Sequence, residues 1–478
     1  MKKGFKSMLS LIVVATMMIG VIGCGSNSNT TAPANESAPA PVENTGNDQA
    51  PAPDPVDLGD EVVELRVLNY LDLTTASAIE EIQTIWEAFE AAHPNIKLVR
   101  EDEYDEAYHN KVEAYAASGN LPDVIYAWPS GRSTTLHTQG LLKDLGPLIA
   151  RDGLASFYNE LAMDPNNQVA GYMGIITQGS TATSAMYVNM EVLDDVGLQP
   201  AKTYSELVAQ VPILRDAGYE TIIMANADTW VMQSCLYSLI IGRFMGEGWD
   251  ERIMNGDTDW TDPAVIASLE FVNQMYDDGV LDRSTLALGY GDVIGLFATN
   301  AGAYLIDGDW RNGAFLTDST TGEALIDPSR QGNFKITVFP ELDVPGVAIP
   351  ARTNSAVLGT GWGMNANLEG AKLEAAWTLV KWLSGKEVQM IRLNTGGITA
   401  PSRIDIDFSQ LELEPLQIEM ANFPNTFDIA TVVVDGVFQG PVYAPLNDGL
   451  QALGLGTITP KEIVDQVQAA FEAWQAEQ

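Results

Sequence analysis

The chain has 478 residues, 46% of them hydrophobic, and a formal net charge of −39 at pH 7. This strongly acidic composition excludes nucleic acids and other polyanions as partners, because like charges repel. Cysteine occurs only at Cys24 and Cys235, and the N-terminal motif described next assigns Cys24 to a different chemistry, so an internal disulfide is excluded. The folded part must therefore be stable through packing alone, and we expect Cys235 to be a buried thiol.

The N-terminus has the pattern of a lipoprotein signal peptide. Three lysines within the first six residues precede an uncharged run from Met8 to Ile22. This run is shorter than the ~20 residues of a membrane span and is typical of a signal-peptide core. It ends in Val21-Ile22-Gly23-Cys24, a lipobox-like sequence. We expect residues 1–23 to be removed and Cys24 to be lipidated, which would anchor the mature, extracytoplasmic chain to the outer face of the cell membrane. An ordinary signal peptide with an incidental cysteine is the alternative.

Residues 24–60 lack aromatic side chains and are rich in proline and small polar residues. Such a composition cannot bury enough apolar surface to offset the entropy lost on ordering, and repeated prolines keep a chain extended. We expect a disordered tether that holds a folded body away from the membrane.

The remaining residues, 61–478, exceed what one hydrophobic core usually supports, so we expect two lobes. The first part of this body alternates short apolar runs with apolar residues at helical spacing. Strand–helix–strand order at this spacing implies parallel pairing and an α/β lobe. The expected order is strand 62–70, helix 79–93, strand 96–100, helix 107–117 and strand 121–127. Later helices carry start signals at Thr203, Asp262 and Thr459.

Motifs of enzymes, metal sites and nucleotide loops are missing from the sequence. The three histidines have no metal-ligand spacing, and no nucleophile elbow or phosphate-binding lysine loop is present. The glycine-rich segment 359–363 lacks that lysine, and we interpret Asp257, Asp259 and Asp262 as turn and cap residues instead of a calcium loop. We therefore expect no catalytic residue, cofactor or metal. The 64 acidic residues leave a glycosidase carboxylate pair open, but no pattern singles one out.

Tryptophan is the most informative residue type in this chain. Six of its ten tryptophans lie at expected strand ends or in loops, and the other four lie on helical patterns that indicate packing. The six are Trp128, Trp230, Trp249, Trp260, Trp310 and Trp362. Ligands of α/β sheets bind beyond the carboxyl ends of strands, where an indole can stack on the apolar face of a sugar. Trp128 follows the third expected strand, and Trp310 follows the apolar run AGAYLID. Asp309, Ser130 and Arg132 nearby supply groups that can bond to sugar hydroxyls.

Ordered segments along the body resemble family 1 extracellular solute-binding proteins, the maltose-binding-protein-like group of sugar transporter lipoproteins. The ordered set, together with the lipobox, carries the resemblance. The segments are FEAAHPNIKLV (89–99), SGNLPDVIYAW (118–128), GLLKDLGPLI (140–149), AMYVNMEVLDDVGLQPAKTYSEL (185–207), GAYLIDGDW (302–310), FKITVFPELDVPG (334–346), GTGWGMNAN and EAAWTLVKWLSGKEVQ (within 359–389), and TGGITAPSR (395–403). The segment GYMGIIT (171–177) lacks the proline of the family's usual Tyr-Gly-Ile-Pro hinge.

The resemblance implies a type II periplasmic-binding-protein fold, in which two α/β lobes are joined by a hinge of three chain crossings with a cleft between them. We place the crossings near Ile176, Val357 and Gly396. The resulting lobes are residues 61–176 with 358–396 at the N-terminal side and residues 177–357 with 397–478 at the C-terminal side.

The family's ligand positions fall, by motif, on Trp128, the region of Trp230, Asp309, Trp310 and the vicinity of Trp362. Further candidates are residues at motif ends that are expected to face the cleft. They are Glu103, Tyr104, Tyr70, Gln178 and Arg403. With Ser130 and Arg132, these residues make up the predicted carbohydrate site.

The implied function is the extracellular carbohydrate-binding component of an ABC importer. Such a protein captures an oligosaccharide by lobe closure and delivers it to membrane permease subunits without chemistry on the ligand. We expect a monomer that is held on the membrane by its N-terminal lipid. The alternatives are a ligand-binding protein for a sensor kinase or for a non-sugar solute, and a secreted glycoside hydrolase.

Overall fold

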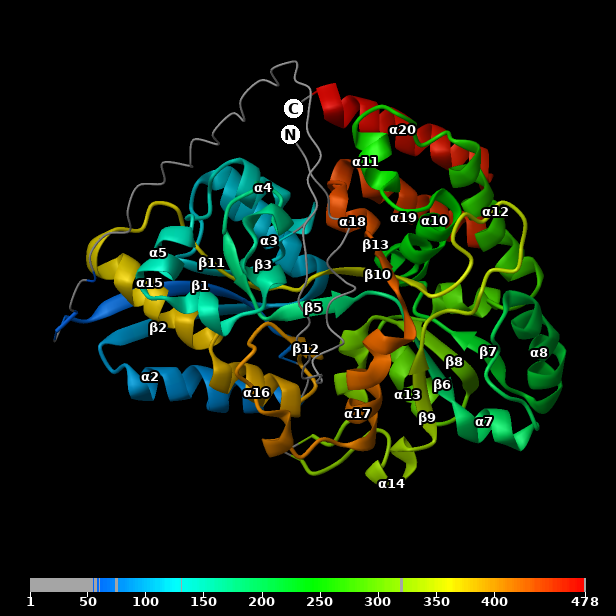
Figure 1. Ribbon diagram of the computed structural model, residues 1–478, viewed down its shortest axis with the longest axis horizontal. Coiled ribbons are helices and arrows are strands. Elements are labelled where there is room, and N and C mark those ends of the chain that lie inside the picture. The colour runs from blue at the N-terminus through cyan, green and yellow to red at the C-terminus, as the bar shows by residue number, and fades with distance from the viewer. Residues whose placement is uncertain are drawn as a thin grey trace, which may run out of the picture.

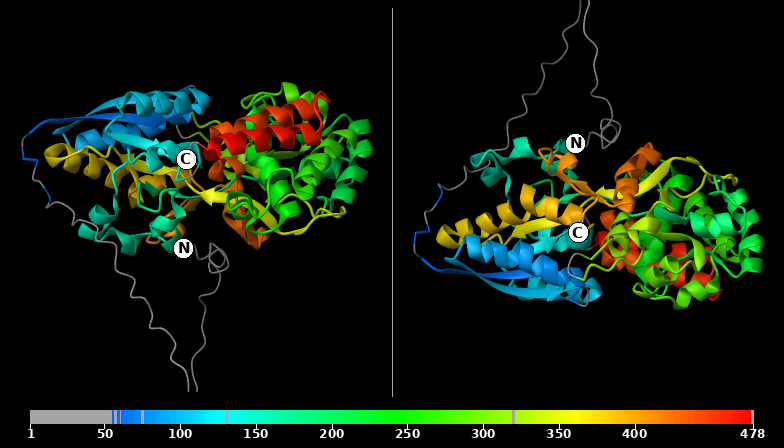
Figure 2. Two further views of the ribbon diagram at one scale, coloured as in Figure 1. Left: turned by 90° about the horizontal axis from the view of Figure 1, so that it is seen from above. Right: turned by 90° about the horizontal axis from the view of Figure 1, so that it is seen from below.

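The computed structural model describes residues 55, 58–59, 61–73, 76–129, 131–318 and 321–476. The predicted signal peptide, Cys24, residues 24–54 of the predicted tether and Ser130 lie outside the described residues. The described chain forms two lobes that lie side by side and are joined in the middle (Figures 1 and 2). None of the helices in this part of the chain combines the length and the apolar character that are needed to span a bilayer.

The N-lobe is built on a five-stranded sheet in the order β2-β1-β3-β11-β4. Its strands are β1 (Val63–Tyr70), β2 (Ile96–Glu103), β3 (Val124–Ala127), β4 (Ile175–Thr177) and β11 (Gly361–Met364). The first three strands pair in parallel, as their spacing in the sequence predicts. β11 arrives from far along the chain and pairs antiparallel with both β3 and β4, so the finished sheet is mixed.

Helices cover this sheet and bury its apolar side chains. They are α1 (Ala76–Glu81), α2 (Ala88–Ala92), α3 (Asp105–Ser118), α4 (Thr134–Thr138), α5 (Gly146–Arg151), α6 (Glu160–Met163), α15 (Gly370–Leu383) and α16 (Lys386–Asn394). The expected helix 79–93 is present as α1, a π-helical stretch Ile82–Glu87 and α2, and the expected helix 107–117 is α3. Trp86, Trp362 and Trp377 are buried in the core beside the sheet.

The C-lobe is built on a four-stranded sheet in the order β7-β8-β6-β9. Its strands are β6 (Ala185–Asn189), β7 (Glu220–Ile223), β8 (Gly302–Asp307) and β9 (Phe334–Thr337). β7 and β8 run parallel, whereas β6 is antiparallel to β8 and β9. All six residues of β8 are buried because the strand lies inside the sheet between two helical layers.

The C-lobe helices surround this sheet and form one continuous core with it. They are α7 (Met190–Asp195), α8 (Tyr204–Ala217), α9 (Thr229–Met232), α10 (Ser238–Met245), α11 (Trp249–Met254), α12 (Pro263–Asp277), α13 (Asp292–Ala298), α14 (Pro328–Gln331), α17 (Pro415–Asn422), α18 (Val434–Val437), α19 (Gly440–Gly454) and α20 (Pro460–Ala476). The start signals are confirmed, since Thr203, Asp262 and Thr459 accept hydrogen bonds from backbone N–H groups of their helices. Cys235 is a buried free thiol, as predicted.

A third sheet, in the order β12-β5-β10-β13, connects the lobes. Its strands are β5 (Gly179–Ala182), β10 (Thr353–Leu358), β12 (Ala400–Pro401) and β13 (Ile429–Thr431). Gln178 alone separates β4 from β5, and Gly359-Thr360 separates β10 from β11, so two links leave the N-lobe sheet side by side. β5 and β10 are hydrogen bonded to each other, which couples these two links mechanically. These two links lie beside the predicted crossings near Ile176 and Val357.

The third link, residues 395–414, follows the boundary between the lobes. Thr399 bonds to Asp309 of the C-lobe, the Ser402 carbonyl accepts from Asn159 of the N-lobe, and α17 then packs in the C-lobe. The predicted crossing near Gly396 lies in this stretch. The lobe boundaries derived from the three predicted crossings stay a prediction.

Candidate functional site

One aromatic surface of the N-lobe lies at the carboxyl ends of its parallel strands. Tyr70 ends β1, Tyr104 follows β2 and Trp128 follows β3, so strand direction alone brings the three side chains to one edge. The ring of Tyr70 lies 5.0 Å from that of Tyr104 and 5.3 Å from that of Trp128, between centroids. All three residues are partly exposed. We call them the N-lobe aromatic face.

A second layer of rings supports this face from within the lobe. The ring of Tyr126 stacks on Tyr70 at 5.7 Å, and the His109 ring lies 4.8 Å from Trp128. Burial and the nearby Arg132 charge lower the pKa of His109 to about 4, so its imidazole is neutral at neutral pH. The N-lobe aromatic face is therefore held by ring–ring packing around a neutral histidine.

The C-lobe presents a matching surface at the carboxyl ends of β7 and β8. Its members are Trp230 on α9, Tyr290 in the loop before α13, and Trp310 in a 3-10 helix, Asp309–Phe315, which follows β8. The ring of Trp230 lies 5.2 Å from that of Tyr290 and 6.3 Å from that of Trp310. Trp310 Nε1 donates to the Tyr290 hydroxyl at 2.6 Å. We call Trp230, Tyr290 and Trp310 the C-lobe aromatic face.

Ionic and polar contacts fix the rings of this C-lobe face. The Arg311 guanidinium lies 3.5 Å from the ring centroid of Tyr290, and its Nε donates to Asp307 at 2.7 Å. The side chains of Arg311 and Asp307 are only 7% and 1% exposed, so the ion pair is shielded from water. The Trp310 indole folds back over Gly308, where an added Cβ would lie 2.2 Å from the ring. Glycine at 308 is therefore needed to give Trp310 its place.

The two aromatic faces lie near each other at the lobe boundary, because charges of the C-lobe act on residues of the N-lobe face and beside it. Burial raises the pKa of Tyr104 to about 12, while the C-lobe residue Arg311 acts in the opposite direction. Burial, followed by the charges of Glu106 and of the C-lobe residue Asp228, raises the pKa of Asp105. Charges of one lobe thus act on side chains of the other, and a solute between them would touch rings from both.

Two predicted ligand residues belong to the hinge instead. Asp309 is buried, and its Oδ2 accepts from the Ala182 N–H and the Thr399 hydroxyl, both at 2.9 Å. Burial raises the pKa of Asp309 to about 7. Gln178 is buried between β4 and β5, and its Oε1 accepts from Arg392 at 2.6 Å. The Asp309 oxygen is thus bonded to β5 and to the third link, and the Gln178 oxygen is bonded to an arginine of the N-lobe helix α16.

Trp362 corrects the sequence prediction most clearly. It lies within β11 and not in a loop, and it is 0% exposed. Its ring packs edge to face against Trp86 at 5.5 Å and against Tyr126 at 5.1 Å. With both faces inside the N-lobe core, Trp362 has no surface on which a ligand could stack, and we remove it from the candidate site.

Three further candidates have other partners in the structure. Glu103 forms an ion pair with Lys111 at 2.6 Å, and Arg403 pairs with Asp405 at 2.8 Å while covering the rings of Phe157 and Tyr158. Arg132 bonds to Asp435 of the C-lobe. Ser130 lies outside the described residues.

The sequence prediction missed Tyr290. It lies in the turn Leu288-Gly289-Tyr290-Gly291, and a single aromatic residue between glycines in a loop before a helix is the signal that was available. This signal is weaker than a tryptophan at the end of a strand, since nothing in it points to the neighbouring strands.

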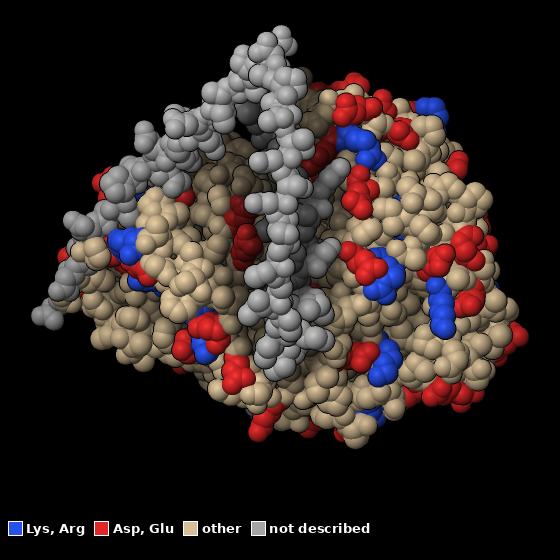
Figure 3. Space-filling model, viewed as in Figure 1, with Lys and Arg blue, Asp and Glu red and all other residues tan. Residues whose placement is uncertain are grey.

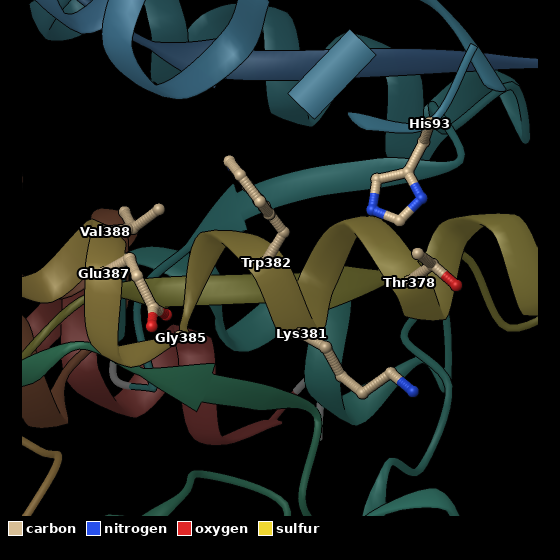
Figure 4. A pocket seen from close by; sticks show the side chains of 7 residues that line it. All are labelled: His93, Thr378, Lys381, Trp382, Gly385, Glu387 and Val388. Atoms are coloured by element: carbon tan, nitrogen blue, oxygen red, sulfur yellow. The ribbon is translucent and has the colours of Figure 1, made fainter. Parts of the chain in front are cut away.

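A separate surface pocket lies on the N-lobe between α15, α16 and the end of α2 (Figure 4). Its lining residues are His93, Thr378, Lys381, Trp382, Gly385, Glu387 and Val388. Lys381 is paired with Asp152, and Trp382 donates to the Ile85 carbonyl. None of the predicted ligand residues lines this pocket, so it is separate from the candidate site.

Comparison with known proteins assigns the chain to a family. A family model described as bacterial extracellular solute-binding protein matches residues 75–390. A search of curated proteins gives no match. Solved structures with the same fold include one from a study of xylan utilization by the thermophilic bacterium Caldanaerobius polysaccharolyticus, with 21% identity, coverage of 85% of this chain and 99% of that chain, and a TM-score of 0.75.

Two other solved structures share this architecture. A chitin oligosaccharide binding protein has 22% identity, covers 87% of this chain and 99% of its own, and has a TM-score of 0.74. The maltose/maltodextrin-binding domain MalE from Bdellovibrio bacteriovorus, bound to maltotriose, has 19% identity, covers 87% and 100%, and has a TM-score of 0.65. These likenesses confirm the two-lobed fold. The family model matches residues 75–390, which is more than half of this chain, so the chain belongs to the bacterial extracellular solute-binding protein family.

Proposed function

We propose that this protein is the carbohydrate-binding component of an ABC importer and that it takes an oligosaccharide between its two aromatic faces. The observation that carries the proposal is the placement of partly exposed rings from both lobes at carboxyl ends of strands. Tyr70, Tyr104 and Trp128 offer apolar faces on one side, and Trp230 and Trp310 offer them on the other. Flat rings on both sides suit the C–H faces of a sugar chain.

An unpaired polar atom of the C-lobe aromatic face supports a hydroxylated ligand. Trp230 Nε1 is buried and has no hydrogen-bond partner among the described residues. An unmade bond at a buried donor costs about 1–3 kcal/mol, and a sugar oxygen would satisfy it. Acidic side chains lie on both lobes over the face seen in Figure 3, and the net charge of −39 favours an uncharged solute over an anionic one.

The similar structures agree with a sugar ligand. One is a chitin oligosaccharide binding protein, and another is bound to maltotriose. We propose that this chain uses the same arrangement for an oligosaccharide.

The proposed mechanism is closure of the lobes on the ligand. A solute that touches both aromatic faces binds the closed arrangement more tightly than the open one, and it shifts the population by that difference in affinity. The hydrogen-bonded strands β5 and β10 let the lobes move as two bodies about one axis. The closed form would then deliver the sugar to membrane permease subunits, with no reaction on the ligand.

A thermal-shift screen against neutral oligosaccharides, with calorimetric titration of each positive, tests the ligand class. A ligand that binds only the folded form raises the melting temperature by mass action. We expect β- or α-linked oligosaccharides to raise it. A shift with amino acids, peptides or anionic solutes, and with no sugar, would reject the proposal, and appearance of cleaved sugar would identify a hydrolase.

We propose further that Cys24 carries the lipid that keeps the protein, as a monomer, at the outer face of the membrane. The lipobox-like sequence at residues 21–24 supports this. In a cell that expresses the full chain, Cys24→Ser should release the protein from the membrane fraction. Membrane association that is unchanged by this substitution would contradict the lipid anchor.

A further inference from the structure

The two lobes touch directly at a site that contains no aromatic-face residue. Arg132 lies in a 3-10 helix of the N-lobe, Gly131–Ser133, and Asp435 lies on α18 of the C-lobe. Arg132 Nε donates to Asp435 Oδ2 at 3.1 Å, and both side chains are 10% exposed. The Arg132 guanidinium also lies 5.4 Å from the ring centroid of Tyr443 on α19. A charged group of one lobe is thus largely removed from water by the other lobe.

The backbone next to Arg132 makes this contact unusually close. A Cβ added to Gly131 would lie 2.2 Å from the Asp435 carbonyl oxygen and 2.7 Å from that of Phe438. Any side chain at position 131 would therefore separate the 3-10 helix from α18. Since these two elements belong to different lobes, the absence of a side chain is what permits this arrangement of the lobes.

Arg132 also has a partner on its own lobe. Its Nη1 donates to Glu106 Oε1 at 2.8 Å, and the Glu106 side chain is 57% exposed. When the lobes separate, Arg132 keeps Glu106 and gains water, and Asp435 is hydrated. The contact can therefore be broken without leaving a buried charge unpaired.

We propose that the Arg132–Asp435 pair is a latch that stabilises the closed arrangement and raises ligand affinity without touching the ligand. Asp435 is the positioning residue, because it holds Arg132 across the lobe boundary. The effect on sugar affinity rests on the proposed function, whereas the effect on lobe closure does not. Affinity falls when a latch is lost, because a smaller fraction of the protein is in the arrangement that binds.

The test uses the full chain and two substitutions that leave both aromatic faces intact. Asp435→Asn removes the charge of the latch with no change of size, and Gly131→Ala inserts a Cβ between the lobes. Glu191→Gln is the control, because it weakens an arginine–acid pair, Arg330–Glu191 at 2.7 Å, that lies wholly within the C-lobe. Small-angle scattering without ligand reports lobe closure, and titration with a neutral oligosaccharide that binds the unmodified protein reports affinity.

We expect Asp435→Asn and Gly131→Ala to increase the radius of gyration of the ligand-free protein, whereas Glu191→Gln leaves it unchanged. We expect a loss of sugar affinity of about tenfold for Asp435→Asn, expressed mainly in faster dissociation. In an Arg132→Gln background, Asp435→Asn should have no further effect. An unchanged radius and an unchanged affinity in Asp435→Asn would overturn the latch.

Two other results separate the possible failures. If Arg132→Gln abolishes sugar binding while Asp435→Asn has no effect, Arg132 is a ligand residue and the latch is wrong. If no oligosaccharide binds the unmodified protein, the proposed function fails, and the comparison of ligand-free radii still decides the latch.

Discussion

The two aromatic faces differ in what holds their rings. The N-lobe face is packed ring against ring, with Tyr70 in contact with Tyr104, Tyr126 and Trp128. In the C-lobe face, by contrast, Trp310 is hydrogen bonded to Tyr290, whose ring is covered by the buried Arg311–Asp307 pair. Each ring–ring pair contributes about 0.5–1.5 kcal/mol. Loss of one partner of a buried ion pair costs more, about 3–5 kcal/mol, because it leaves a buried charge uncompensated. We infer that the C-lobe face sets the position of a sugar and that the N-lobe face adapts to it.

The largest expected effect tests the ionic support of the C-lobe face. Asp307→Ala leaves Arg311 buried without its partner and should lower the free energy of unfolding by about 3–5 kcal/mol. Its N-lobe counterpart, Glu103→Ala, breaks a pair with Lys111 in which both side chains are about one-third exposed, so it should cost less than about 1 kcal/mol. Urea unfolding of both variants measures the difference. Equal losses would remove the contrast between the two faces.

Trp310→Ala should produce the next largest effect. It should weaken ligand binding more than it lowers the stability of the fold. Loss of a stacking anchor is expected to weaken binding of an oligosaccharide by about 2–4 kcal/mol, which calorimetric titration would measure. Tyr290→Phe, which removes only the hydroxyl that Trp310 contacts, should weaken binding by less than about 1.5 kcal/mol. Trp382→Ala, in the separate N-lobe pocket, is a control that should leave affinity unchanged. Normal affinity of Trp310→Ala would exclude it from the site.

The pH dependence of stability tests the hinge residue Asp309, which ties the C-lobe face to the connecting strands. Burial raises the pKa of Asp309 to about 7, so the folded protein binds this proton more tightly than the unfolded chain. The free energy of unfolding should therefore decrease as the pH rises from about 4 to about 7. Asp309→Asn resembles the protonated form and removes this contribution.

Between pH 5 and pH 8, the free energy of unfolding of the unmodified protein should fall by about 2 kcal/mol relative to that of Asp309→Asn. Thermal melts at the two pH values measure it, and histidine contributions cancel in the comparison. A difference that is independent of pH would show that the carboxylate stays charged in the folded state.

Tyr104→Phe should give the smallest effect. It removes one hydroxyl opposite Arg311 and keeps the ring contact with Tyr70. We expect a loss of sugar affinity of about 0.5–1 kcal/mol and no change in melting temperature. A loss greater than that of Trp310→Ala would reverse the assignment of positioning to the C-lobe face.

Strand direction made much of the candidate site predictable. Tyr70, Tyr104 and Trp128 lie at one edge because each ends or follows a parallel strand, and such positions can be read from the alternation of strands and helices. Trp310 follows β8 for the same reason. Local patterns were sufficient here because parallel strands share one carboxyl edge.

Long-range pairing explains what the sequence did not reveal. Trp362 lies near glycines that suggest a loop, yet Gly361–Met364 pairs between β3 and β4, and that pairing turns the indole into the core. Asp309 and Arg132 have polar side chains near tryptophans, as ligand residues would. Their partners, Ala182, Thr399 and Asp435, are more than 80 positions away in the sequence and come near only through the fold.

The position of β11 also governs how the protein is made. β4 joins the N-lobe sheet only through β11, and β11 is synthesised after every strand of the C-lobe sheet. A chain that emerges from its N-terminus therefore cannot complete its first lobe until residues beyond 361 have appeared. The second lobe, in turn, waits for α17 to α20 at the end of the chain. Neither lobe can therefore finish folding before the C-terminal part of the chain has been synthesised.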